Sequence, residues 1–135
     1  MYLRAFIAGF ISTLVFHQGL YWLLYQTGSL PQPPWNMSPV PPFGVPSVLS
    51  LAFWGGVWGI ALWLMVRRFF GARQWLMAVG LGALLPSLVA LAIVFPLKGG
   101  AFMAGWDPRI LVGALLLNGA WGLGVIVLMR LMRSR

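Results

Sequence analysis

The sequence predicts an all-α integral membrane protein, a bundle of four transmembrane helices arranged as two helical hairpins. Hydrophobic residues make up 61% of the 135 residues and charged residues only 7%, whereas soluble domains carry about 25% charged residues. The chain contains four apolar stretches of roughly 20 residues, the length of helix that crosses the hydrocarbon core. Basic residues flank these stretches, which is typical of membrane topology and excludes a nucleic-acid-binding stripe. We treat residues 1–135 as one transmembrane domain.

The first helix is predicted over residues 5–25. Small and polar residues recur along it at every fourth position: Ala5, Gly9, Thr13, His17 and Tyr21. Residues with this spacing share one face, which we expect to contact other helices and not lipid. A cleaved signal peptide is the alternative. No small-residue cleavage pattern follows the apolar stretch, so we predict a retained helix.

A proline-rich outer loop is predicted over residues 26–47. Prolines occupy seven positions between 31 and 46. Because proline has no backbone N–H and favours an extended path, this loop can lie at the lipid headgroups without regular secondary structure. Two roles stay open. The loop is either a stiff connector or a lid or docking surface, since long loops without secondary structure are often functional.

The second and third helices are predicted over residues 48–66 and 74–95. Ser47 is placed to cap the second helix, and its Gly55 and Gly59 should let another helix approach closely. Pro86 lies near the middle of the third helix. Because proline cannot donate to the carbonyl of Gly82, we expect a kink there.

The fourth helix is predicted over residues 110–129, with Asp107 as its N-cap and Pro108 at its first position. Ala114, Asn118 and Gly122 should form its packing face. The sequence Gly-Val-Trp-Gly-Ile at 56–60 is similar to Gly-Ala-Trp-Gly-Leu at 119–123. This match suggests that the hairpin was duplicated. A chance match in so biased a composition is the alternative.

The distribution of basic residues predicts the orientation. On one side of the predicted membrane lie Arg4, Arg67, Arg68, Arg73, Arg130, Arg133 and Arg135, and on the other lie Lys98 and Arg109. By the positive-inside rule both termini are in the cytoplasm. We therefore expect a multi-pass protein of the bacterial inner (cytoplasmic) membrane.

Polar residues near the middle of the predicted spans are the candidate binding site: Thr13, His17, Trp58, Asn118 and Trp121. Polar groups in hydrocarbon are costly unless paired, so we expect them to converge inside the bundle. His17 should bond to a group on another helix, such as Asn118 or a Trp indole. The alternatives are contact with a substrate and axial ligation of a haem or chlorin, which would need a second subunit or an open axial position. No other cofactor and no metal site is expected.

Catalytic arrangements are excluded by composition. Asp107 is the chain's only acid and there is no cysteine, so paired carboxylates, thiolate metal sites and a membrane carboxylate for proton coupling are all absent. The sequence thus predicts a non-catalytic accessory, assembly or scaffolding subunit of a larger membrane complex. Its expected partners are the lipid bilayer and other membrane subunits or a second copy, and not nucleic acid. The alternatives are a small transporter or channel-like module with a midplane cavity, and a haem- or chlorin-binding subunit ligated through His17.

Overall fold

Four helices of the computed structural model are long and apolar enough to cross a membrane: Tyr2–Gln26, Ser47–Val66, Gly71–Leu97 and Pro108–Arg133. The structure describes residues 1–30, 32–41 and 43–133. Positions 31 and 42 of the predicted loop and positions 134–135 of the basic tail, including Arg135, lie outside the described residues. The prediction of an all-α bundle of four apolar helices is confirmed.

The first and third of these helices each contain a π-helical turn. The first consists of α1 (Tyr2–Ser12), η1 (Thr13–His17) and α2 (Gln18–Gln26), and the third of α4 (Gly71–Val89), η2 (Ala90–Val94) and α5 (Phe95–Leu97). The second and fourth helices, α3 (Ser47–Val66) and α6 (Pro108–Arg133), are uninterrupted. The third helix continues through Pro86, which cannot donate to the Gly82 carbonyl, and its π-helical turn begins at Ala90.

The proline-rich connection contains a short hairpin that was not predicted. Strands β1 (Pro39–Val40) and β2 (Val45–Pro46) pair antiparallel, with Pro39 opposite Pro46. The connection between α5 and α6 contains the turn η3 (Phe102–Trp106). All four helices extend by one to four residues beyond one or both of their predicted limits. Helix ends are the least certain part of such predictions because tertiary contacts set them.

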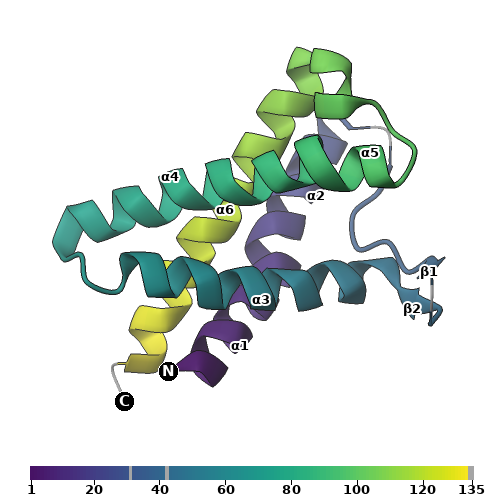
Figure 1. Cartoon of the computed structure of the whole chain (residues 1–135). Helices are drawn as coiled ribbons and strands as arrows, with labels where there is room; N and C mark the ends of the chain where they lie inside the picture. Colours follow the sequence, from purple (N-terminus) through teal and green to yellow (C-terminus); the bar gives the residue numbers. More distant parts are fainter. Residues whose placement is uncertain (31, 42, 134–135) are drawn as a thin grey trace.

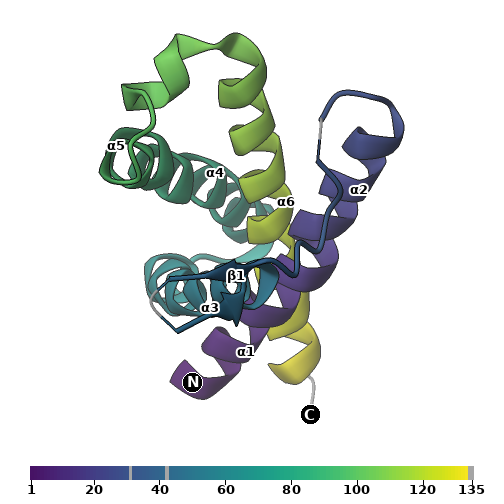
Figure 2. The ribbon, with the colours of Figure 1, turned by 90° about the vertical axis from the view of Figure 1, so that its right-hand side faces the viewer.

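The helices form two layers. Figures 1 and 2 show α3 and α4 running side by side, with α6 and the α1–α2 helix crossing behind them. Helix α1 packs mainly against α3 and then α6, and α4 packs mainly against α6. Both chain termini lie at the same end of the bundle (Figure 1).

Of the two N-cap residues predicted from the sequence, only Asp107 caps its helix. The Asp107 carboxylate accepts a hydrogen bond of 3.0 Å from the backbone N–H of Arg109, so the predicted cap of α6 is confirmed. The prediction for Ser47 is wrong, because Ser47 is already the first residue of α3 and makes no side-chain cap. The N–H groups of Ser47 and Val48 bond instead to the carbonyls of Ser38 and Asn36 in the loop.

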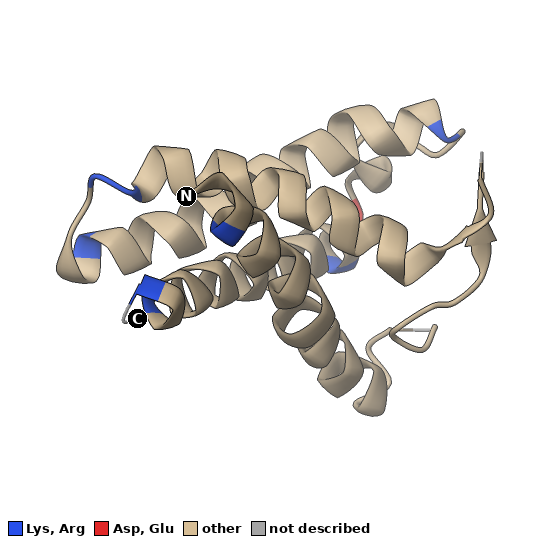
Figure 3. Cartoon of the chain, turned by 90° about the horizontal axis from the view of Figure 1, so that it is seen from below, with Lys and Arg blue, Asp and Glu red and all other residues tan. Residues whose placement is uncertain are grey.

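The bundle is most tightly packed near its termini. Its largest fully buried apolar side chains all lie in the last three turns of α3 and α6: Leu62, Val66, Val125, Ile126 and Met129. In contrast, α2 buries only Gln18. Figure 3 shows most Lys and Arg residues gathered near the two termini and the single acid away from them. We call this region the basic end and define it by Arg4, Arg67, Arg68, Arg73, Arg130 and Arg133.

Candidate functional sites: interior polar contacts and the basic end

Glycines bring the backbones of α1 and α3 into direct contact. A Cβ atom added to Gly59 would lie 2.6 Å from the carbonyl oxygen of Ala5 and 2.9 Å from Cα of Gly9. A Cβ on Gly9 would in turn collide with the carbonyl of Gly55. Real Cβ atoms do not approach backbone atoms this closely, so only glycine allows this spacing. The partner of the Gly55 and Gly59 face is therefore the predicted small-residue stripe of the first helix.

Helices α4 and α6 contact each other in the same way. A Cβ added to Gly82 would lie 2.9 Å from Cα of Gly122, and a Cβ on Gly122 would collide with the carbonyl of Ala78. Ala114, predicted to share this packing face, is half-buried two turns earlier in α6. The α4–α6 contact thus centres on Gly122.

Two interior polar residues, Ser12 and Trp121, join α1 to α6, and Thr13 shares one of their acceptors. The carbonyl oxygen of Gly9 accepts hydrogen bonds from Thr13 Oγ1 at 2.9 Å and from the indole Nε1 of Trp121 at 3.1 Å. Ser12 Oγ donates to the carbonyl of Trp121 at 2.6 Å. Ser12, Thr13 and Trp121 are all buried. We call these residues the interior polar contact; it unites the predicted Thr13 and Trp121 and adds Ser12.

The other predicted midplane residues lie apart from this contact. Asn118 donates a hydrogen bond of 2.9 Å to Ser87 Oγ and so links α6 to α4. Trp58 is half-buried and packs against the apolar core. The five residues predicted to converge are therefore distributed over different helix contacts.

The bond that the structure gives His17 runs to its own helix and not to another helix as predicted. Gln18 Nε2 lies 3.0 Å from His17 Nδ1, and Asn118 and Trp121 bond elsewhere. The Gln18 amide is oriented by the backbone N–H of Trp35, which donates to its Oε1 at 2.7 Å. Since the Gln18 NH₂ group must then donate to Nδ1, the neutral imidazole carries its proton on Nε2.

A backbone carbonyl released by the π-helical turn η1 holds the loop against the first helix. In η1 the N–H of Gln18 bonds to the carbonyl of Thr13, five residues back. The carbonyl of Leu14, which an α-helix would use, instead accepts the indole N–H of Trp35 at 2.9 Å. Such π-helical turns are rare and occur frequently at functional sites. Trp35 is thus bonded through both its backbone and its side chain.

The basic end contains a polar contact that the sequence did not predict. Gln74, only 2% exposed, donates to the carbonyl of Val66 at 3.1 Å and accepts from Arg130 at 2.7 Å. This amide joins the end of α3, the start of α4 and the end of α6. The only available sequence signal was a glutamine at the start of an apolar span, which does not identify its partners.

Comparison with protein-family models, curated proteins and solved structures finds no match for this chain.

Proposed function

We propose that this protein is a non-catalytic accessory subunit that docks onto a larger membrane-protein complex. The observation that carries the proposal is the interior polar contact. Ser12 and Trp121 bond across α1 and α6, Thr13 bonds to Gly9 of its own helix, and all three are buried. Their polar groups are therefore engaged within the chain. A transporter needs hydrated polar groups along its path. We therefore assign the binding of a partner protein to the outer surface of the bundle.

The proline-rich loop is the surface we assign to a partner. Its middle is held by Trp35, and the carbonyls of Asn36 and Ser38 bond to the first turn of α3. Phe43, in the turn between β1 and β2, is 87% exposed. Residues 27–66 carry no charge. A positioned, uncharged surface with exposed aromatic and apolar side chains suits contact with another membrane protein, since preorganisation lowers the entropic cost of binding.

The gathering of arginine at the basic end supports an orientation with both termini in the cytoplasm, by the positive-inside rule. Four apolar helices support a multi-pass location, and we place the protein in a bacterial inner membrane. The matched contacts of Gly59 with Ala5 and of Gly122 with Ala78 support the inference that the two hairpins arose by duplication.

Axial ligation of a haem or chlorin is less well supported than a structural role for His17. Histidines that ligate a metal almost always donate their other ring N–H to an acceptor. In this protein Gln18 donates to Nδ1, which places the proton on Nε2, the nitrogen that would have to bind iron. The geometry therefore favours His17 as a hydrogen-bonding residue next to the Trp35 anchor.

Site-specific photo-crosslinking in the native membrane tests the docking role. A photoreactive amino acid at Phe43 should give one discrete crosslinked product with a protein that also co-elutes at a fixed ratio in mild detergent. The same amino acid at Leu76, which is 73% exposed on α4, is the matched control and should not give that product. A Phe43→Ser substitution should lower the co-eluting fraction. Equal crosslinking from both positions, or elution without a stoichiometric partner, would contradict the proposal.

A further inference from the structure

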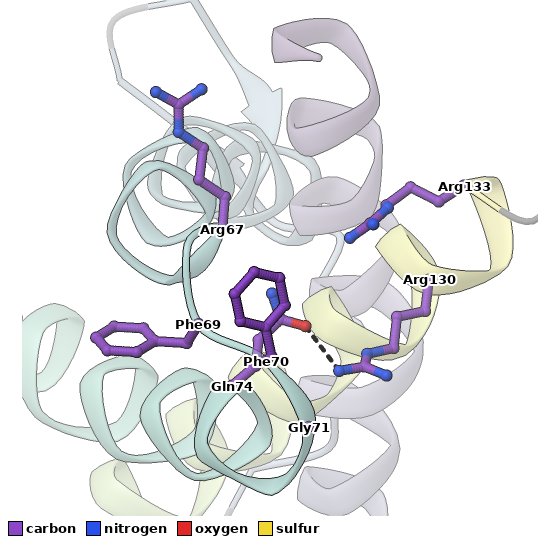
Figure 4. Close-up of a pocket in the computed structure, with 7 residues that line it drawn as sticks. All are labelled: Arg67, Phe69, Phe70, Gly71, Gln74, Arg130 and Arg133. Carbon is purple, nitrogen blue, oxygen red and sulfur yellow. Dashed lines mark hydrogen bonds between the residues drawn. The ribbon is translucent and has the colours of Figure 1, made fainter.

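Two neighbouring pockets open at the basic end. The first, about 460 Å³, is lined by Arg67, Phe69, Phe70, Gly71, Gln74, Arg130 and Arg133 (Figure 4). The second, about 530 Å³, shares Arg67 and Arg133 and adds Met1, Arg4, Trp63, Arg68 and Met129. Neither pocket contains an acidic residue. The lining therefore combines five arginines with aromatic and apolar side chains.

Two of these arginines are held in place by neighbouring side chains. Arg130 donates to the buried Gln74 and lies over the Trp75 ring, with its Cζ 5.0 Å from the ring centroid. Arg133 lies 5.9 Å from the Trp63 ring centroid. Aromatic faces attract guanidinium groups without neutralising their charge. The guanidinium groups are therefore ordered and still cationic.

The chain places no carboxylate side chain of its described residues beside this cluster. Its only carboxylate side chain, Asp107, belongs to the start of α6, at the opposite end of that helix from Arg130 and Arg133. Like charges gathered in a partly desolvated pocket repel one another unless a counter-ion joins them. Guanidinium groups match phosphate oxygens in charge and geometry. Gly71 also places the first turn of α4 at the pocket, where helix N–H groups lack intrahelical partners.

We propose that the first pocket, between the ends of α3 and α6 and the start of α4, binds the phosphate group of an anionic phospholipid. Phe70 is 83% exposed at its rim, so apolar surface for an acyl chain adjoins the arginines. Basic pockets between transmembrane helices are sites at which anionic headgroups bind. A free phosphate ion would satisfy the arginines but has no apolar part to contact Phe70.

Native mass spectrometry of the purified full chain in detergent tests this site, with phosphatidylglycerol and phosphatidylcholine as the lipid probes. Phosphatidylglycerol should be retained at lower concentration than phosphatidylcholine. The double variant Arg67→Gln/Arg133→Gln should weaken its retention roughly 25-fold, at about fivefold for each arginine. Lys98→Gln/Arg109→Gln removes the same charge at the opposite end and should leave retention unchanged.

Two further variants separate the position of the arginines from their total charge. Arg67→Lys/Arg133→Lys preserves the charge and should retain most of the binding. Gln74→Met preserves every charge but removes the acceptor that positions Arg130, so retention should fall. Equal weakening by both double Gln variants, or no preference for phosphatidylglycerol in the wild type, would overturn the site. Displacement of the lipid by an equal concentration of inorganic phosphate would overturn the lipid assignment in favour of a soluble anion.

Discussion

The α1–α3 pair and the α4–α6 pair use the same backbone contact and differ in the polar groups around it. Gly59 lies on Ala5 as Gly122 lies on Ala78. At the basic end the Arg67 guanidinium donates to the Met1 sulfur at 3.2 Å in the first pair. Arg130 donates to an amide oxygen in the second pair. The comparison indicates that glycine contacts determine how each pair packs, whereas the polar groups give each pair its own bonding partners.

Replacing a contact glycine is expected to have the largest effect. Gly59→Ala and Gly122→Ala each force a methyl group against a carbonyl of the facing helix. Overpacking of this kind costs about 1–3 kcal/mol, so both variants should unfold at lower temperature in detergent. If the two contacts are equivalent, the two losses should be similar.

The control glycine is Gly80 on α4, where an added Cβ meets nothing within 4 Å. Gly80→Ala should be neutral or stabilising, because alanine favours helix by up to about 1 kcal/mol. A loss at Gly80 as large as that at Gly122 would show that the backbone contact is not the cause.

Removing the acceptor of Arg130 is expected to have the next largest effect. Gln74→Met removes the amide oxygen to which Arg130 donates and keeps a side chain of similar length. A hydrogen bond to a charged group contributes about 1.5–3 kcal/mol to stability. Because Arg130 is only half-buried, we expect the free energy of unfolding to fall by an amount near the lower limit. Chemical denaturation in mixed micelles measures it. Arg67→Gln, which alters the exposed partner in the first pair, should cost less.

The indole of Trp121 should contribute a smaller amount. Trp121→Phe removes the donor to the Gly9 carbonyl and keeps most of the ring volume. Hydrogen bonds between transmembrane helices contribute about 0.6 kcal/mol on average, so the thermal midpoint should fall slightly. Trp58→Phe at the matching position of the first pair is the control, because Trp58 packs on the core. An equal fall for both variants would mean that ring packing, and not the hydrogen bond, is responsible.

The smallest expected change is at the start of α6. Asp107→Asn should leave stability within about 0.5 kcal/mol, since asparagine caps helices as well as aspartate does. Asp107→Ala should cost about 1 kcal/mol, because it removes the acceptor of the Arg109 N–H. The thermal midpoints of the two variants, measured in the same detergent, test this difference. A large loss in the Asn variant would show that the charge of Asp107, and not its cap, matters.

The features that the sequence predicted correctly depend on local spacing. The apolar stretches gave the four helices, and the Asp107–Pro108 pair gave the start of α6 because capping involves residues two positions apart. The spacing of Gly55 and Gly59 predicted a close contact without identifying the facing helix. That partner depends on how the helices cross, which composition does not specify.

The features that the sequence did not predict depend on contacts between distant residues. The bond between Gln74 and Arg130 joins residues 56 positions apart. The turn η1 contains no proline or glycine to announce it, and the carbonyl it releases is used by Trp35, 21 positions along the chain from Leu14. His17 lies on the predicted stripe but bonds to Gln18, because Trp35 fixes the orientation of the Gln18 amide.

The docking-subunit account requires that water does not reach the interior polar contact between α1 and α6. The most direct test is the water accessibility of Ser12. Since the chain has no cysteine, single-cysteine variants can be labelled without background in intact membrane vesicles. Ser12→Cys, at a side chain 0% exposed, should react with a water-soluble maleimide only after denaturation. Ser29→Cys and Ala72→Cys, both at exposed positions, should react in the folded protein from opposite sides of the membrane. If the folded Ser12→Cys variant were labelled as fast as the Ser29→Cys variant, that result would reveal a hydrated path and contradict the docking-subunit account.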